Sequence, residues 1–207
     1  MKKRMAQQVF DEWARDYHAD GMEDSHWQSV RLAFRNIPRS SGNYLEIGIG
    51  NGYGIRHMAS NQYNRGICYG LDISANMVKK AQNRMKDLTN VRLAQADFLT
   101  WEPPENIRFS SIFSMEVFYY FTDIQAGIDR AVSFLEPEGR LFVLVNYYRE
   151  NESTHSWSDD LNTPMTLWSE KDYEEAFIRA GLMEIQQMRI NKGPDDQGTL
   201  CTIGTKE

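Results

Sequence analysis

The segment Tyr44–Gly54 could bind a nucleoside or a nucleotide through its backbone. It places glycines at four alternate positions after a short apolar run, and Glu46 lies two residues before the first glycine. Glycine accepts positive φ and lets a ligand approach the backbone closely, because no Cβ stands in the way. A second apolar run, Ile67–Leu71, ends in Asp72. A carboxylate at this distance from the glycines is suitably placed to accept hydrogen bonds from a ribose diol.

The glycine spacing discriminates between nucleotide cofactors. A dinucleotide-binding turn has the pattern G-x-G-x-x-G, and a triphosphate-binding loop ends in Gly-Lys-Ser/Thr. Counting from Gly48 puts Tyr53 at the third glycine, and counting from Gly50 puts Ile55 there; no Gly-Lys-Ser/Thr follows. Both cofactors are therefore disfavoured, whereas Glu-x-Gly-x-Gly-x-Gly reads without a break. Taken alone, the segment also fits a simple strand-to-helix turn.

Five motifs in order resemble the class I S-adenosylmethionine-dependent methyltransferases over about a hundred residues. They are Glu46–Gly52, Gly70–Met77, Ala94–Phe98, Phe113–Phe118 and Leu135–Arg140. The last resembles a turn that usually reads L-x-P-G-G, and glutamate at position 138 replaces its first glycine. That departure affects the geometry of the turn and not the cofactor site. The resemblance implies S-adenosylmethionine as cofactor and S-adenosylhomocysteine as product.

The resemblance assigns polar contacts to five positions. Glu46, Gly48 and Gly50 would hold the methionine end, Asp72 the ribose hydroxyls, and Asp97 the adenine amino group. Two alternatives stay open from the residues themselves. The Glu46 carboxylate could instead accept hydrogen bonds from loop amides, and the Asp97 carboxylate could simply cap a turn.

The remaining implied contacts are mostly apolar. Phe98 would flank the adenine, Ile73 and Met77 would pack on it, and Ser114 with Met115 would supply backbone contacts near the methionine group. Phe98 and Met77 could instead be ordinary core residues. The pattern Phe-Asp-x-x-Ala-x-x-Tyr ending at Tyr17 resembles a lid helix, whose tyrosine would reach over the methionine group.

Methyl transfer asks little of protein side chains, because the sulfonium carbon is already electrophilic and alignment is the main requirement. A base is needed only when the acceptor is protonated. Candidates for that role are His26, Glu116, Tyr147 and His155. The aromatic residues near them could clamp a planar acceptor or hold a cationic amine. For either histidine, a solvated loop position is the competing interpretation.

The fold expected is α/β: a Rossmann-like three-layer sandwich around a seven-stranded, mostly parallel sheet with a C-terminal antiparallel strand pair. The resemblance implies strand order 3-2-1-4-5-7-6. Hydrophobic patterning predicts strands at 43–48, 66–72, 91–96, 109–115 and 139–146, and between them helices at 53–62, 74–86 and 123–134.

The ends of the chain add further elements. The sequence predicts helices over Met5–Tyr17, Ser25–Phe34 and 170–180, then strands at Leu182–Ile190 and Thr199–Thr205. We expect a single domain, 1–207. Its segments are N-terminal lid helices (1–37), a cofactor-binding core (43–146), a substrate-side insertion (147–168) and a C-terminal helix with the strand pair (169–207).

Composition excludes several classes of function. Formal net charge is −6 and no lysine- or arginine-rich stripe occurs, which argues against a broad nucleic-acid surface. No apolar run approaches the ~20 residues that span a membrane, and the histidines and cysteines form no metal pattern. Cys68 and Cys201 fall in strands expected on opposite halves of the sheet, so we expect no disulfide and a reducing, cytoplasmic location.

The function predicted is transfer of a methyl group from S-adenosylmethionine to an oxygen or nitrogen atom of a small-molecule acceptor. The strand end at 113–118 lacks the Asn/Asp-Pro-Pro-Tyr/Phe motif common in enzymes that methylate adenine or amide nitrogens. The alternatives are a protein or RNA methyltransferase and a non-catalytic protein that binds the cofactor or its product. The sequence does not determine the acceptor or the oligomeric state.

Overall fold

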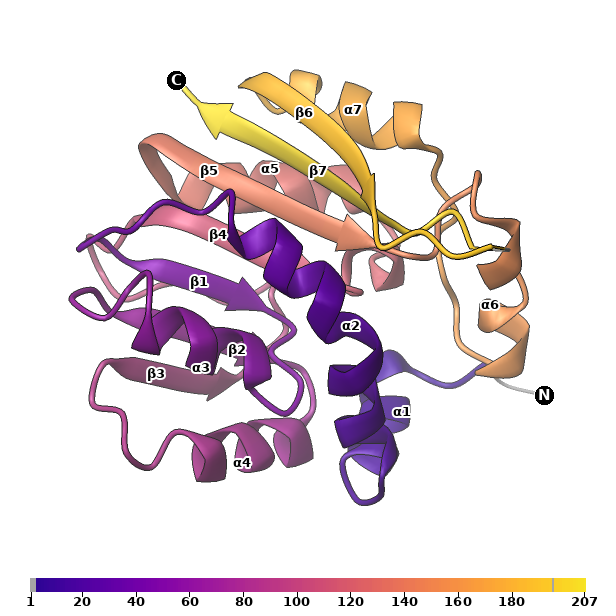
Figure 1. Cartoon of the computed structure of the whole chain (residues 1–207), viewed down its shortest axis with the longest axis horizontal. Helices are drawn as coiled ribbons and strands as arrows, with labels where there is room; N and C mark the ends of the chain where they lie inside the picture. Colours follow the sequence, from indigo (N-terminus) through magenta and orange to yellow (C-terminus); the bar gives the residue numbers. More distant parts are fainter. Residues whose placement is uncertain (1–2, 195) are drawn as a thin grey trace.

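A computed structural model describes residues 3–194 and 196–207. A seven-stranded sheet runs through the middle of the molecule (Figure 1), in the order β3-β2-β1-β4-β5-β7-β6. The strands are β1 (Tyr44–Ile47), β2 (Cys68–Asp72), β3 (Val91–Gln95), β4 (Phe109–Met115), β5 (Leu135–Val145), β6 (Leu182–Ile190) and β7 (Thr199–Lys206). The first five are parallel, and β7 pairs antiparallel with both β5 and β6. This architecture confirms the expected Rossmann-like fold.

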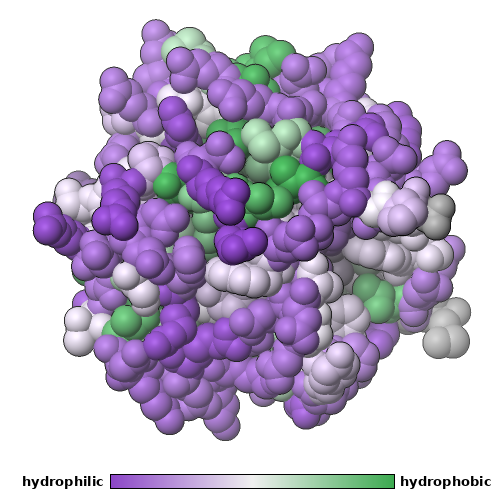
Figure 2. Space-filling model, in the orientation of Figure 1, coloured by the Kyte–Doolittle hydropathy of each residue, from purple (hydrophilic) through white to green (hydrophobic). Residues whose placement is uncertain are grey.

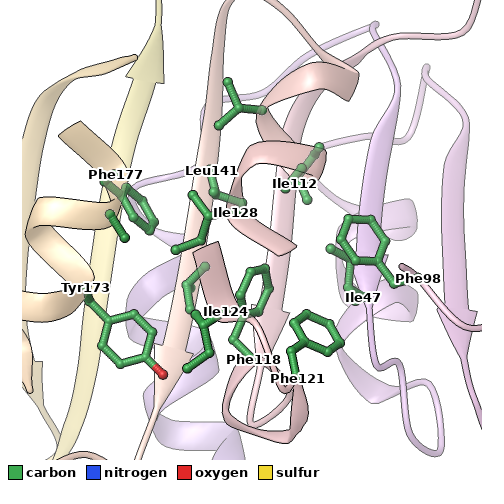
Figure 3. Packing of buried hydrophobic residues seen from close by; sticks show 14 of the residues in the cluster. Ile47, Phe98, Ile112, Phe118, Phe121, Ile124, Ile128, Leu141, Tyr173 and Phe177 are labelled. Carbon is green, nitrogen blue, oxygen red and sulfur yellow. The ribbon is translucent and has the colours of Figure 1, made fainter. Parts of the chain in front are cut away.

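Helices cover both faces of the sheet. They are α1 (Ala6–Trp13), α2 (His18–Phe34), α3 (Tyr53–Ser60), α4 (Ala75–Arg84), α5 (Ile124–Phe134), α6 (Trp157–Asp160) and α7 (Glu170–Arg179), with 3-10 turns η1 (Phe118–Tyr120) and η2 (Glu152–Thr154). Helices α2, α3 and α4 contribute to the apolar cluster on one face. Helices α5 and α7 contribute to the cluster on the other face, shown in Figure 3. These are the three layers of the sandwich.

Alternation along β1 explains why two separate cores form. Leu45 and Ile47 belong to the α5/α7 cluster, whereas Tyr44 belongs to the α2/α3 cluster. Successive side chains of a strand point to opposite faces of the sheet. Glu46 therefore lies on the same face as Tyr44, beneath α3.

Local signals set several helix ends. Ser74 begins α4 by accepting a hydrogen bond from the Met77 amide, and Asp123 begins α5 by accepting one from Ala126. Ser169 forms a capping box with Asp172 at the start of α7. Such side chains satisfy backbone amides that have no partner inside the helix. The C-terminal helix was therefore predictable at both ends.

Two predicted element boundaries are wrong. The expected helix over Met5–Tyr17 ends at Trp13, and the next helix begins at His18 instead of Ser25. Asp16 accepts hydrogen bonds from the backbone and ring of His18, which stabilises a tight turn between the two helices. Tyr17 consequently lies in this turn, and its side chain is 75% exposed.

The fifth strand also starts earlier than predicted, directly after α5. Leu135 pairs with Phe109, and the register then shifts before Arg140 pairs with Ser111. Within this irregular stretch Glu138 has a φ of 63°, the left-handed conformation that favours glycine. The residue that departs from the family motif therefore occupies the position where glycine would be least strained.

Three further features bear on the chemistry that the described residues offer. Cys68 and Cys201 are free and buried on β2 and β7, with three strands between them, as predicted. Within the described residues, no helix is long and apolar enough to cross a membrane, and no group of potential metal ligands gathers. Figure 2 shows a mainly hydrophilic face, with apolar atoms gathered over β5 and β7 beside α2.

The buried face of α7 should contribute more to the stability of the protein than its exposed face. Phe177 is fully buried between α7 and the sheet, whereas the next residue, Ile178, is 58% exposed. We expect Phe177→Ala to lower the free energy of unfolding by about 3–5 kcal/mol, because it removes a large buried side chain and leaves a cavity. The control Ile178→Ala should change it by less than ~0.5 kcal/mol. Urea denaturation measures both, and equal effects would contradict the packing described.

Candidate functional site

A cavity of about 780 Å³ opens at the carboxyl ends of the central strands. Its volume is in the range of roughly 300–1,000 Å³ that is typical of small-molecule sites. The turn after β1, the ends of β2 and β4, and the segment after β3 form its floor. Residues of α1, α2, η1 and the 157–164 segment form its walls. In a parallel sheet, ligands bind where the strand order reverses, which here is between β1 and β4.

The glycines of the β1 turn serve two different purposes. Gly48, Gly50 and Gly52 all have positive φ, of 76°, 53° and 88°. A Cβ on Gly48 would lie 2.2 Å from a methyl of Val117, and one on Gly52 would press on Ala81. A Cβ on Gly50 would meet nothing within 4 Å. The middle glycine therefore leaves open space in the wall of the cavity, while the other two permit close packing.

Asp72 connects the end of β2 to this turn. Its Oδ2 accepts a hydrogen bond from the Gly50 amide at 2.9 Å, and its Oδ1 accepts one from Ser74 at 2.9 Å. Burial, with a smaller contribution from the nearby carboxylate of Asp11, raises the pKa of the carboxyl to about 6. The group lines the cavity, so a ligand with hydroxyl donors or positive charge would stabilise its ionised form.

Glu46 lies deeper, under the first turn of α3. Its Oε2 accepts a hydrogen bond from the Tyr44 hydroxyl at 2.8 Å, and its carboxylate also accepts one from the Ile55 amide. A Cβ on Gly54 would lie 2.7 Å from its Oε1, so the helix approaches it closely. Burial raises its pKa to about 8. The side chain thus accepts hydrogen bonds from β1 and from α3, and it also lines the cavity.

Three of the predicted adenine contacts follow the ends of the neighbouring strands β2 and β3. Ile73, Asp97 and Phe98 all line it. The Asp97 Oδ1 accepts a hydrogen bond from the Leu99 amide at 2.9 Å and so caps the turn after β3. Phe98 is 3% exposed and also packs against Phe121 in the core, so it belongs to both the cavity wall and the core.

Two predicted cofactor residues lie outside the cavity lining. Met77 is fully buried beneath the N-terminal helices, in contact with the cluster of Ala14 and Ala19. It occupies the first turn of α4, where its face of the helix points toward α1 and α2. The Ser114 hydroxyl donates to the Ile47 carbonyl at 3.1 Å within the sheet. Met115, one residue later, does line the cavity, as do Gly48, Gly50 and Tyr17.

The catalytic candidates divide in the same way. His26 and Glu116 line the cavity, and burial lowers the pKa of His26 to about 4. Tyr147 instead packs against Tyr119 inside the core at 5.4 Å between ring centroids. The His155 ring bonds to the Arg149 carbonyl on the protein surface. The structure therefore does not support the last two as bases.

Sequence reasoning missed the residues that connect the N-terminal helices to the site. The Asn51 side chain donates to the Ala19 carbonyl at 3.0 Å and to Glu23 at 3.1 Å. Asp11 accepts a hydrogen bond from the Ser74 hydroxyl at 2.6 Å. Asn51 stands between two of the turn glycines, and Asp11 falls within the lid pattern. Their polar side chains at these two positions were a signal in the sequence, but no sequence pattern identified the residues to which they bond.

Burial of Glu46 makes stability depend on pH. Its pKa is about 8 in the folded protein, above the ordinary value of 4.5. Between these two pH values the folded state therefore binds more protons than the unfolded state. The unfolding free energy should therefore fall as pH rises from about 5 to 8. Because Asp72 and Glu116 act in the same direction, Glu46→Gln should reduce the slope without abolishing it. Urea denaturation across this range measures the slope, with Glu174→Gln on the exposed face of α7 as control; an unchanged slope in Glu46→Gln would refute the assignment.

Comparison with solved structures identifies close similarity over the whole chain. A chain assigned as a methyltransferase, solved in complex with the Trm112 methyltransferase activator of Haloferax volcanii, is 29% identical, with 95% of this chain and 96% of that chain covered and a TM-score of 0.83. The N-methyltransferase NodS of Bradyrhizobium japonicum, in complex with S-adenosylhomocysteine, is 18% identical (97% of each chain covered, TM-score 0.74).

A third similar structure is phosphoethanolamine N-methyltransferase 2 of Haemonchus contortus, solved with a phosphorylated amine and S-adenosylhomocysteine. It is 18% identical, covers 96% of this chain and 60% of that chain, and has a TM-score of 0.73. Comparison with curated proteins found no matching sequence. A family model described as a methyltransferase domain matches residues 17–187, which is most of the chain. The chain therefore belongs to this methyltransferase family and is an S-adenosylmethionine-dependent methyltransferase.

Proposed function

We propose that the chain transfers the methyl group of S-adenosylmethionine to an oxygen or nitrogen atom of a small molecule held in the cavity. The observation that carries this proposal is the cover that the N-terminal segment and the 157–164 segment make over the cavity. The Arg4 amide donates to the Asn162 carbonyl at 2.7 Å, which joins these two segments. The Phe10 ring meets Tyr120 edge-on at 5.5 Å, which joins α1 to η1. A covered cavity favours a small acceptor over a protein or RNA chain.

The residues at the floor fit the cofactor. The space above Gly50 admits a ligand next to the backbone, and the Asp72 carboxylate faces the same cavity. We assign Asp72 to the ribose hydroxyls, and Asp97 with Phe98 to the adenine. Glu46 and the turn glycines are assigned to the methionine end. Buried carboxylates suit a cofactor that carries a sulfonium and an ammonium group.

The bound cofactor supplies an electrophilic methyl group, so the protein mainly has to orient the acceptor. Met115 and Glu116 end β4 at the cavity and are assigned to the region of transfer. The acceptor side is largely aromatic, with Phe10, Tyr120 and Trp157 among its lining residues. Exclusion of water by such rings strengthens polar contacts to the acceptor. Two structurally similar proteins are N-methyltransferases by name, which is consistent with a nitrogen or oxygen acceptor.

The open space at Gly50 offers a matched test of the cofactor position. Gly181, just after α7, also has positive φ (80°) and open space around its missing Cβ, but it lies away from the cavity. Replacing either glycine by alanine should cost about 1–2 kcal/mol of stability, because both positions are left-handed. Only Gly50→Ala should weaken S-adenosylhomocysteine binding, by about tenfold or more (about 1.4 kcal/mol). Calorimetric titration measures both variants; wild-type affinity in Gly50→Ala would place the ligand elsewhere.

The size of the acceptor can be tested without knowing its identity. A cell extract is separated into small metabolites and macromolecules, and each fraction is incubated with the protein and methyl-labelled S-adenosylmethionine. We expect label to enter the small-molecule fraction, because the cover over part of the cavity favours a compact acceptor. The Asp72→Asn variant serves as the control for background transfer. Label confined to protein or RNA would overturn the proposed acceptor class, and no transfer beside intact cofactor binding would favour a non-catalytic binding protein.

A further inference from the structure

Glu116 is an acidic side chain in the aromatic half of the cavity. It follows the last residue of β4, where its own amide still bonds to the Leu144 carbonyl of β5 at 2.9 Å. Its φ is 60°, a left-handed conformation that is unfavourable for a residue with a side chain. Backbone strain of this kind persists where the surrounding structure enforces it, and it concentrates at functional sites. The sheet therefore holds this carboxylate at the cavity wall in a costly conformation.

The carboxylate accepts hydrogen bonds but forms no ion pair with any residue that the structure describes. Its Oε2 accepts a hydrogen bond from the Tyr119 hydroxyl at 2.9 Å, and its Oε1 accepts one from the Asn146 amide. Among the ion pairs of the described residues, none involves Glu116. The side chain is 9% exposed, and burial raises its pKa to about 7. A cationic ligand in the cavity would supply the missing counter-charge.

Aromatic rings complete the surroundings of this carboxylate. Tyr119 and Tyr120 follow it on η1, with ring centroids 4.6 Å apart, and Phe10 meets Tyr120 from the lid helix. All three rings line the cavity together with Glu116. An ammonium group is attracted to aromatic faces, and more strongly where water is excluded. A carboxylate among such rings is a binding site for a positively charged nitrogen.

We propose that Glu116 with the rings of Phe10, Tyr119 and Tyr120 binds the amino group of the acceptor, so that the substrate is an alkylamine methylated on nitrogen. This inference rests on the proposed function and narrows it. In the transfer, the acceptor ammonium gives one proton to the Glu116 carboxylate, which later passes it to solvent. The freed nitrogen lone pair then forms the new carbon–nitrogen bond, and the carbon–sulfur bond breaks with its electron pair left on sulfur. The products are an N-methylammonium ion, S-adenosylhomocysteine and one proton.

The test compares charged and neutral ligands of the same shape. Benzylamine, 2-phenylethylamine and hexylamine are each titrated into protein saturated with S-adenosylhomocysteine, beside the alcohol of the same carbon skeleton. At neutral pH the amines are ammonium ions. We expect the amines to bind about tenfold more tightly than their alcohols, the effect of a partly desolvated cation site. Equal binding, or no binding of any amine, would overturn the inference.

Variants connect the preference to the carboxylate. Glu116→Gln keeps the size of the side chain and removes its charge, so the preference for amines should disappear. The control Glu138→Gln changes an exposed glutamate with a similar left-handed backbone (φ 63°) in the irregular first part of β5, and should behave like the wild type. S-adenosylhomocysteine is titrated into every variant as a separate readout. Persistence of the preference in Glu116→Gln, or loss of S-adenosylhomocysteine binding there, would overturn the inference, whereas failure of that binding in the wild type would instead refute the proposed function.

Discussion

The hydrogen bonds that Asp72 accepts from Gly50 and Ser74 hold the whole site in place. They connect the carboxyl end of β2 to the glycine turn of β1 and to the first turn of α4. The Ser74 hydroxyl in turn donates to Asp11 of α1. Through these contacts the buried Asp72 carboxylate positions the floor of the cavity and connects it to α1, which forms part of the cavity wall. The left-handed Gly50 leaves open the space that this arrangement surrounds.

Burying acidic groups carries a cost that the structure offsets only in part. Glu46, Asp72 and Glu116 each accept two hydrogen bonds, yet burial still raises the pKa of all three. A positively charged ligand would stabilise their ionised forms, since an opposite charge nearby favours ionisation. Near neutral pH, the protein without a ligand is therefore less stable than it would be if these carboxylates were paired with cations. This cost to folding is consistent with a site built to receive cationic ligands.

Much of the floor of the site could be predicted from the sequence, because it depends on local patterns. Glycine spacing, an acidic residue after an apolar run and strand alternation identified the β1 turn and Asp72. Side-chain direction was less predictable, since it depends on which elements pack on either side. Met77 faces α1 and α2 instead of the cavity, and Tyr147 turns into the core against Tyr119. The sequence predicted a break between the two N-terminal helices but placed it after Tyr17, because the turn that the pairing of Asp16 with His18 stabilises lies within an otherwise helical pattern.

The most direct test of the account is a crystal structure of the protein with S-adenosylhomocysteine. The account predicts the ribose hydroxyls within hydrogen-bonding distance of the Asp72 carboxylate, the adenine between Ile73 and Phe98, and the sulfur directed toward Glu116 at the end of β4. It also predicts an intact connection between the lid helix and Ser74. A ligand bound elsewhere, or bound in this cavity with its ribose turned away from Asp72, would contradict the central claim.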